Sequence, residues 1–116
     1  AAIPQALEAS VQVLVGADAL APDWFLNKSG TRMLAAAAVQ QGVPVYVAAS
    51  RDKVVDQRTG DHLTVRCGAP AEVWDGAPAR VAVVNPYFER VPLGLLAGVI
   101  SDVGVVPPAE VRQLSV

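Results

Sequence analysis

Short apolar runs and one longer helical pattern alternate along this chain of 116 residues. Residues 11–15 are rich in valine and leucine, which predicts a strand that is buried on both faces. Residues 30–41 carry apolar side chains at spacings of three and four and contain four consecutive alanines, which favours a helix. Residues 43–48 form a second apolar run. The order strand, helix, strand predicts a right-handed parallel crossover.

Weaker patterns predict further elements on both sides of this unit. The stretch 50–60 is polar and turn-rich, and residues 56–61 are predicted to form a mobile loop. Ser29 or Thr31 is expected to cap the start of the long helix, and Gly42 to close it in the left-handed conformation. The remaining expected elements are helices at residues 1–10, 92–98 and 107–114 and strands at residues 64–67, 80–85 and 99–101.

This alternation of strands and helices defines the expected fold. We predict a three-layer, Rossmann-like α/β domain with a mostly parallel sheet, and the length places residues 1–116 in a single domain. The chain lacks an initiator Met, and its first helix leads directly into a strand. We therefore interpret it as the C-terminal piece of a longer protein; a complete small α/β domain is the alternative.

Composition and charge narrow the classes of protein and partner. Hydrophobic residues make up 53% of the chain and charged residues 17%, which argues against disorder and predicts apolar surface for oligomer contacts or a further domain. A net charge of −2 gives no reason to expect nucleic-acid binding. No apolar run approaches the roughly 20 residues of a membrane span, and the first residues lack the basic region of a signal peptide. A cytoplasmic protein without membrane contact is expected.

The first candidate for chemistry is Asp18, which follows the strand at residues 11–15 and the permissive Gly16. Ligands of open α/β sheets bind outside the carboxyl ends of the strands, where this residue falls. Small and apolar neighbours would desolvate its carboxylate, which makes it a candidate general acid. The alternative is a structural aspartate that caps a turn or the next helix.

Three more polar residues are expected to join Asp18. Residues 27–31, Asn-Lys-Ser-Gly-Thr, place polar groups at a helix N-terminus, where free N–H groups favour anionic or hydroxylated ligands. Asn27 supplies a hydrogen-bond donor and an acceptor, Lys28 supplies a positive charge, and Lys53 follows the second strand at the same carboxyl edge. We expect the four side chains to converge on one cleft. The alternatives are an exposed loop pair at residues 27–28 and a solvated Lys53.

Several reactive or aromatic residues are not assigned to this site. Cys67 is the only cysteine, so the chain cannot build a disulfide framework, and this thiol is expected to be a small buried group. His62 has no second candidate ligand nearby, so no metal or other cofactor is predicted. Trp24 and Phe25 are expected in a loop that either covers the site or packs on a neighbour. A dinucleotide-dependent dehydrogenase is disfavoured because no G-x-G-x-x-G follows a strand.

Four ordered motifs carry a resemblance to a known family. They are Gly16-Ala17-Asp18, Asn27-Lys28-Ser29-Gly30-Thr31, Gly42-Val43-Pro44-Val45-Tyr46-Val47-Ala48-Ala49 and Asn85-Pro86-Tyr87-Phe88-Glu89, followed by Val91-Pro92 and Ile100-Ser101-Asp102. This order resembles the alpha, beta and delta subunits of translation initiation factor 2B and two related isomerases, of ribose-1,5-bisphosphate and of methylthioribose-1-phosphate. Val54, Glu89 and Ser101-Asp102 stand where the family pattern has Phe, Asp and Thr-Glu.

The resemblance implies a fold like that of the NagB, RpiA and CoA transferase group and roles for the candidate residues. Asp18 would be the proton donor, paired in the isomerases with a cysteine that precedes the Gly-Ala-Asp motif. Asn27 and Lys28 would contact the substrate, and Lys53 would hold a phosphate. Cys67 follows that motif and does not match the catalytic cysteine.

Two functions follow as expectations. One is an aldose–ketose isomerase that acts on a phosphorylated ribose; the other is a non-catalytic regulatory subunit, of the initiation factor 2B type, that senses a sugar phosphate or a nucleotide. The resemblance also implies dimer contacts, and we expect a homodimer or a higher homo-oligomer. The apolar residues expected at the contact are Tyr87, Phe88, Val91, Leu93, Leu95 and Leu96. The alternatives are that the two last leucines pack against the sheet, or that the patch meets a further domain.

Overall fold

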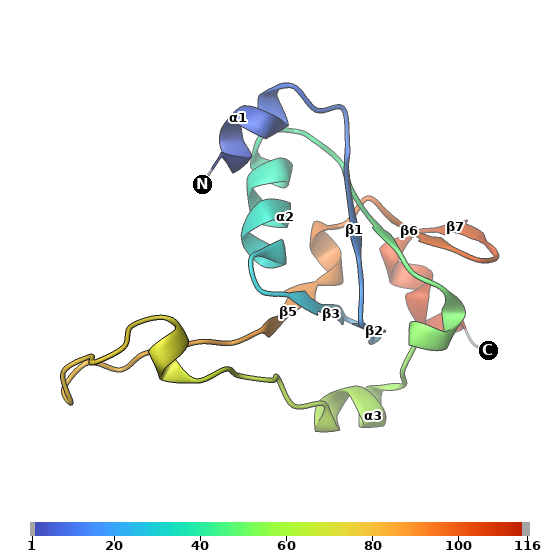
Figure 1. The fold of residues 1–116 in the computed structure, drawn as a ribbon. Helices are drawn as coiled ribbons and strands as arrows, with labels where there is room; N and C mark the ends of the chain where they lie inside the picture. Colours follow the sequence, from blue (N-terminus) through green and yellow to red (C-terminus); the bar gives the residue numbers. More distant parts are fainter. Residues whose placement is uncertain (1, 115–116) are drawn as a thin grey trace.

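The computed structural model describes residues 2–114 and contains two sheets (Figure 1). The larger sheet has four strands in the order β1 (Val13–Gly16), β4 (Val45–Ala48), β6 (Gly98–Ser101) and β7 (Gly104–Val106). The β1–β4 and β4–β6 pairs are parallel, and the β6–β7 pair is antiparallel. The predicted α/β class with a mostly parallel sheet is therefore confirmed.

Helices α1 (Ile3–Glu8) and α2 (Thr31–Gln40) lie on one face of this sheet (Figure 1). Val45, Val47 and Val99 alternate toward that face and are at most 1% exposed, so they belong to the core. The opposite face leaves Leu14 59% and Val105 64% exposed. The prediction that the first strand is buried on both faces is therefore wrong for the described residues. That strand also begins at Val13, two residues later than expected, because Val11 is 87% exposed and lies outside the ladder.

One end of α2 forms as expected and the other does not. Gly42 has φ +74°, so it closes the helix in the left-handed conformation, as predicted. At the start, Gly30 occupies the cap position with φ +104° and no side-chain cap is formed there. The hydroxyl of Thr31 donates to the carbonyl of Lys28 at 2.6 Å, and that of Ser29 donates to the carbonyl of Pro86 at 2.6 Å. Both predicted caps are therefore wrong.

The smaller sheet was not predicted. Strands β2 (Ala19–Leu20), β3 (Trp24–Lys28) and β5 (Phe88–Pro92) pair in that order, and both pairs are antiparallel. Trp24 and Phe25 lie in β3 rather than in a loop, and Phe25 is fully buried. Aromatic and branched residues fit a half-buried pleated surface, which explains the strand. Residues 27 and 28 consequently end a strand instead of opening a helix.

Two other assignments change between sequence and structure. The expected mobile loop at residues 56–61 is helix α3 (Gln57–His62), because the Asp56 carboxylate accepts a hydrogen bond from the Thr59 N–H at 2.7 Å and caps it. The expected strands at residues 64–67 and 80–85 do not form. A single bridge between Cys67 and Pro86 joins these stretches.

Residues 63–87 form a segment that we call the arm, which extends away from the two sheets (Figure 1). It contains one 3₁₀ turn, Pro70–Glu72. The expected helices at residues 92–98 and 107–114 are also 3₁₀ segments, Leu93–Leu95 and Pro108–Gln113. The strand expected at residues 99–101 is confirmed as β6, one residue longer at its start. No helix among residues 2–114 has the length and apolar character needed to cross a bilayer.

Candidate functional site

The turn after β1 brings two of the sequence motifs side by side. The Asp18 N–H donates to the carbonyl of Leu26 at 2.7 Å. Strand β2 begins at Ala19, which pairs with Leu26 in β3, so this hydrogen bond places the Asp18 backbone beside Leu26, one residue before Asn27. Neighbouring strands lie roughly 4.8 Å apart. The predicted acid and the predicted amide therefore share one edge of the fold.

The segment that carries Lys53 lies on the other side of β2. Leu20 forms a parallel bridge with Val54, and the Val55 N–H donates to the carbonyl of Leu20 at 2.8 Å. Lys53 ends the 3₁₀ turn Arg51–Lys53, directly before this bridge. The backbone segments of Lys53, Asp18 and Asn27 are thus three neighbours across the smaller sheet.

The side chain of Asp18 is exposed, whereas the two residues after it are buried. Ala19 and Leu20 take the core positions of β2, which leaves the aspartate at the solvent edge. The prediction that apolar neighbours bury its carboxylate is therefore wrong for residues 2–114. The desolvation argument for a general acid has no support from these residues.

Asn27 and Lys28 have different surroundings. The amide of Asn27 is half-buried and donates to the Thr31 hydroxyl at 3.0 Å. Successive strand residues face opposite sides, so Lys28 lies on the other face of β3. Its Nζ atom is 4.9 Å from the ring centre of Tyr87 and 5.6 Å from that of Phe88, within cation–π range.

The segments that carry Asp18, Asn27 and Lys53 lie side by side, whereas Lys28 lies on the other face of β3. Five surface cavities with volumes from about 170 to 610 Å³ lie on the described residues. None of these five is lined by Asp18, Asn27, Lys28 or Lys53. The arrangement within residues 2–114 is an open, polar edge with one exposed carboxylate and two exposed ammonium groups.

Tyr87 is a residue whose contacts the motif pattern did not reveal. Its hydroxyl donates to both carboxylate oxygens of Glu72, at 2.5 and 2.7 Å, and its ring lies against Gly68 so closely that a Cβ there would collide with it. The Tyr87 hydroxyl lowers the pKa of Glu72, and the same hydrogen bond raises the pKa of Tyr87. These contacts lie within the arm and join its 3₁₀ turn to Tyr87, whose ring lies beside Lys28.

The turn that carries Lys53 is held by a second acidic residue. Asp102 accepts hydrogen bonds from the Arg51 backbone N–H at 2.9 Å and from Arg51 Nε at 3.1 Å. The first of these bonds is the main reason why the pKa of Asp102 lies below its ordinary value. The Asp102 position was visible in the sequence as a departure from the family pattern, but its partner was not.

Two residues outside the site were also placed by the structure. Cys67 is exposed, so the prediction of a small buried thiol is wrong; the extended arm provides no core to cover it. His62 lines a cavity of about 610 Å³ together with Asp56, Arg58 and Thr59. Among residues 2–114, no three His, Cys, Asp or Glu side chains are grouped so as to hold a metal ion.

The fold is a Rossmann-like α/β domain, and its Gly-Ala-Asp and Asn-Lys-Ser-Gly-Thr motifs meet beside the smaller sheet. A family model described as the initiation factor 2 subunit family matches residues 1–108. The chain belongs to this family.

Relatives of this chain include methylthioribose-1-phosphate isomerases. A methylthioribose-1-phosphate isomerase from Nitratidesulfovibrio vulgaris is 38% identical over 112 residues, which cover 90% of this chain and 32% of that protein. The isomerase of the same name from Trichoplax adhaerens is 36% identical over 111 residues, or 87% of this chain and 29% of that protein.

Similar solved structures include both an initiation factor subunit and an isomerase. Initiation factor eIF-2B subunit delta from A. fulgidus has a TM-score of 0.79 at 28% identity, over 93% of this chain and 34% of that one. The 5-methylthioribose 1-phosphate isomerase of Pyrococcus horikoshii OT3 has a TM-score of 0.79 at 31% identity, over 97% of this chain and 34% of that one. This chain thus spans about a third of the length of the relatives that it matches.

Proposed function

We propose that this chain supplies the proton-donor and substrate-binding edge of a sugar-phosphate aldose–ketose isomerase. The observation that carries the proposal is the backbone pairing around β2, which sets Asp18 beside Leu26, one residue before Asn27, and brings the Lys53 segment to the other side of β2. The isomerase names of relatives at 36% and 38% identity support it.

The chemistry assigns a different task to each side chain. An open-chain ribose phosphate would isomerise by proton or hydride movement between C1 and C2, and Asp18 would donate a proton to the sugar oxygen that gains charge. The Asn27 amide would hydrogen-bond a sugar hydroxyl. Lys28 and Lys53 would bind the phosphate as point charges.

Turnover in the complete protein that carries this chain tests the proposal, with methylthioribose-1-phosphate and ribose-1,5-bisphosphate as substrates. We expect Asp18→Asn to lower kcat by at least about a hundredfold, the range of a lost acid–base group. Lys28→Ala should raise KM. Asp75→Asn is the matched control, because Asp75 is an exposed aspartate on the arm. Unchanged turnover in both Asp18→Asn and Lys28→Ala would end the catalytic assignment.

A non-catalytic regulatory subunit is the second candidate. It is favoured by one observation: the initiation factor subunit and the isomerase have the same TM-score to this chain. In that case the edge would bind a sugar phosphate or a nucleotide without converting it. Binding by calorimetry without any turnover in the wild-type protein would select this function.

A further inference from the structure

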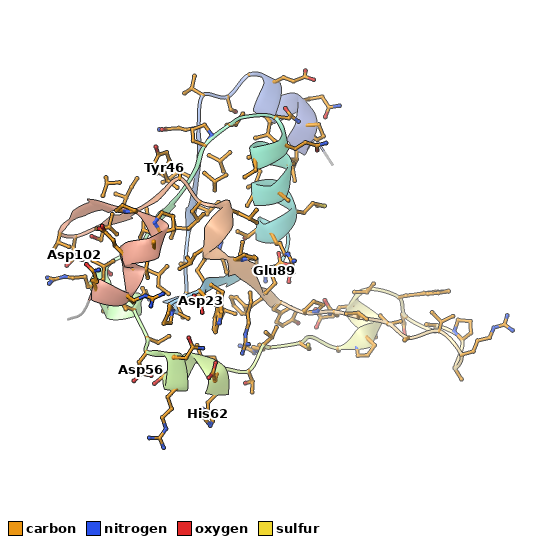
Figure 2. The ribbon with its side chains drawn as sticks, turned by 180° about the vertical axis from the view of Figure 1, so that it is seen from behind. Asp23, Tyr46, Asp56, His62, Glu89 and Asp102 are labelled. Atoms are coloured by element: carbon orange, nitrogen blue, oxygen red, sulfur yellow. The ribbon has the colours of Figure 1, made fainter. Side chains whose placement is uncertain are left out.

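Glu89 reaches from β5 to the beginning of α2 (Figure 2). Its Oε2 atom accepts hydrogen bonds from the backbone N–H groups of Gly30 at 2.7 Å and Arg32 at 3.0 Å. A helix leaves its first N–H groups without intrahelical partners, and these groups attract anions. In this chain an anionic side chain of the protein itself already occupies that position.

The same segment holds the turn between β3 and α2 at two further points. The Ser29 N–H donates to the carbonyl of Tyr87 at 2.9 Å, and the Ser29 hydroxyl donates to the carbonyl of Pro86. Within the β3–β5 ladder, Glu89 is the register partner of Asn27. Residues 86–89 therefore fix the backbone on both sides of Lys28.

We propose that Glu89 is a positioning residue, which holds Asn27 and Lys28 in place for a sugar phosphate and keeps the N-terminus of α2 from serving as the phosphate site. This inference rests on the function proposed above. A phosphate at the helix would have to displace the Glu89 carboxylate from two hydrogen bonds. The phosphate would instead bind the ammonium groups of Lys28 and Lys53, while the helix keeps its internal anion.

Kinetics of three variants in the complete protein test the proposal, with methylthioribose-1-phosphate as the probe. Glu89→Ala should raise KM roughly tenfold to a hundredfold, the usual effect of removing a residue that orients a binding group, with a smaller change in kcat. Glu89→Gln keeps an oxygen that accepts from the same N–H groups, so it should restore most of the affinity. Glu8→Ala should leave both constants unchanged, because Glu8 is exposed on α1 and has no side-chain hydrogen bond among residues 2–114.

The opposite result has a distinct signature. If the helix N-terminus binds the phosphate, removal of the competing carboxylate in Glu89→Ala should lower KM. A lower or unchanged KM therefore overturns the proposal. A fall in kcat with KM unchanged overturns it as well, because binding of the probe would then not depend on Glu89.

Amide hydrogen exchange separates this inference from the proposed function. We expect residues 27–32 to exchange faster in Glu89→Ala than in the wild-type protein and to recover in Glu89→Gln. If the wild-type protein neither binds nor converts the probe, the proposed function fails, and exchange alone decides the role of Glu89. Faster exchange then supports its positioning of the turn, and unchanged exchange overturns it.

Discussion

Tyr87, the last residue of the arm, contacts the rest of the arm through its hydroxyl group and the candidate site through its ring. The hydroxyl group binds the Glu72 carboxylate on the arm, and the ring lies 4.9 Å from the ammonium group of Lys28. An electrostatic attraction between Glu72 and Lys28 also contributes to the lowered pKa of Glu72. The position of a candidate phosphate-binding lysine thus depends on a residue of the arm.

The Tyr87–Glu72 bond joins two residues of the arm, so the internal structure of the arm should depend on pH. The folded pKa of Glu72 lies below its ordinary value of 4.5, so this stabilisation is present above pH 4.5 and is lost as the pH falls through the lowered pKa. The folded pKa of Tyr87 lies above its ordinary value of 10.0, so the stabilisation is also lost as the pH rises through that raised pKa. We expect acid titration to change the fluorescence of Trp74 on the arm.

Tyr87→Phe should abolish this transition, because phenylalanine cannot donate to the carboxylate. Tyr46→Phe, at the other tyrosine of the chain, is the control and should retain it. An identical acid transition in both variants would show that the Tyr87 hydrogen bond does not govern the arm.

For single residues, the sequence predicted which segments carry the candidate site, but it did not predict what surrounds each side chain. Asp18, Asn27 and Lys53 were found from what precedes and follows them, and their segments do lie together. The exposure of Asp18 could not be found in this way, because it depends on which residues of β2 enter the core. Glu89 was visible only as a departure from a motif, since its partners are 57 and 59 residues away.

Elements with strong local patterns were predicted, and elements that depend on distant partners were not. Strands β1, β4 and β6 and helix α2 have continuous apolar runs or helical spacing, and they form near the expected positions. The smaller sheet is closed by β5, which comes 60 residues after the end of β3 in the pairing of Lys28 with Phe88. The arm contains apolar residues that favour a strand, but no strand among residues 2–114 lies beside it to pair with. One bridge between two of its own residues, Cys67 and Pro86, forms instead.

The C-terminal end of α2 gives a direct test of backbone conformation. Gly42→Ala should lower the free energy of unfolding by about 1 kcal/mol, because alanine is strained at a positive φ of 74°. Gly94→Ala is the matched control. An added Cβ meets nothing within 4 Å at either glycine, and of the two only Gly42 has a positive φ. Urea denaturation measures the free energy of unfolding of both variants. Equal stability of the two variants would contradict the role of Gly42 as a left-handed helix end.

Across the whole molecule, the apolar surface differs from the one expected for a dimer contact. Val91, Leu93 and Leu96 are at most 7% exposed and belong to the core, so only part of the predicted patch reaches solvent. The exposed large apolar side chains lie instead in four places. They are on the open sheet face (Leu14, Ile100 and Val105), beside the strand ends (Val11 and Val103), on α2 (Met33 and Val39) and on the arm (Val73, Trp74, Val81 and Val84). This distribution supports association, since burial of apolar area stabilises contacts by about 25 cal/mol per Å².

We therefore propose that the chain forms a homodimer, and sedimentation over a concentration series tests it. The mean mass should rise toward that of a dimer, and Ile100→Lys on the open sheet face should weaken association because a charge would enter the contact. Val84→Lys makes the same change on the arm and distinguishes the two surfaces. A monomer at high micromolar concentration, with neither variant altering the mass, would contradict the proposal.

The central claim is that Asp18, Asn27 and the Lys53 turn form one sugar-phosphate site, and hydrogen exchange of the complete protein with and without methylthioribose-1-phosphate tests it most directly. We predict slower exchange on ligand addition in peptides that cover residues 16–20, 24–28 and 51–55. In the double variant Asp18→Asn and Lys28→Ala, the ligand should not slow exchange in these peptides. The His62 cavity beside α3 serves as the internal comparison. Protection confined to residues 56–63, or no protection at residues 16–28, would contradict the account.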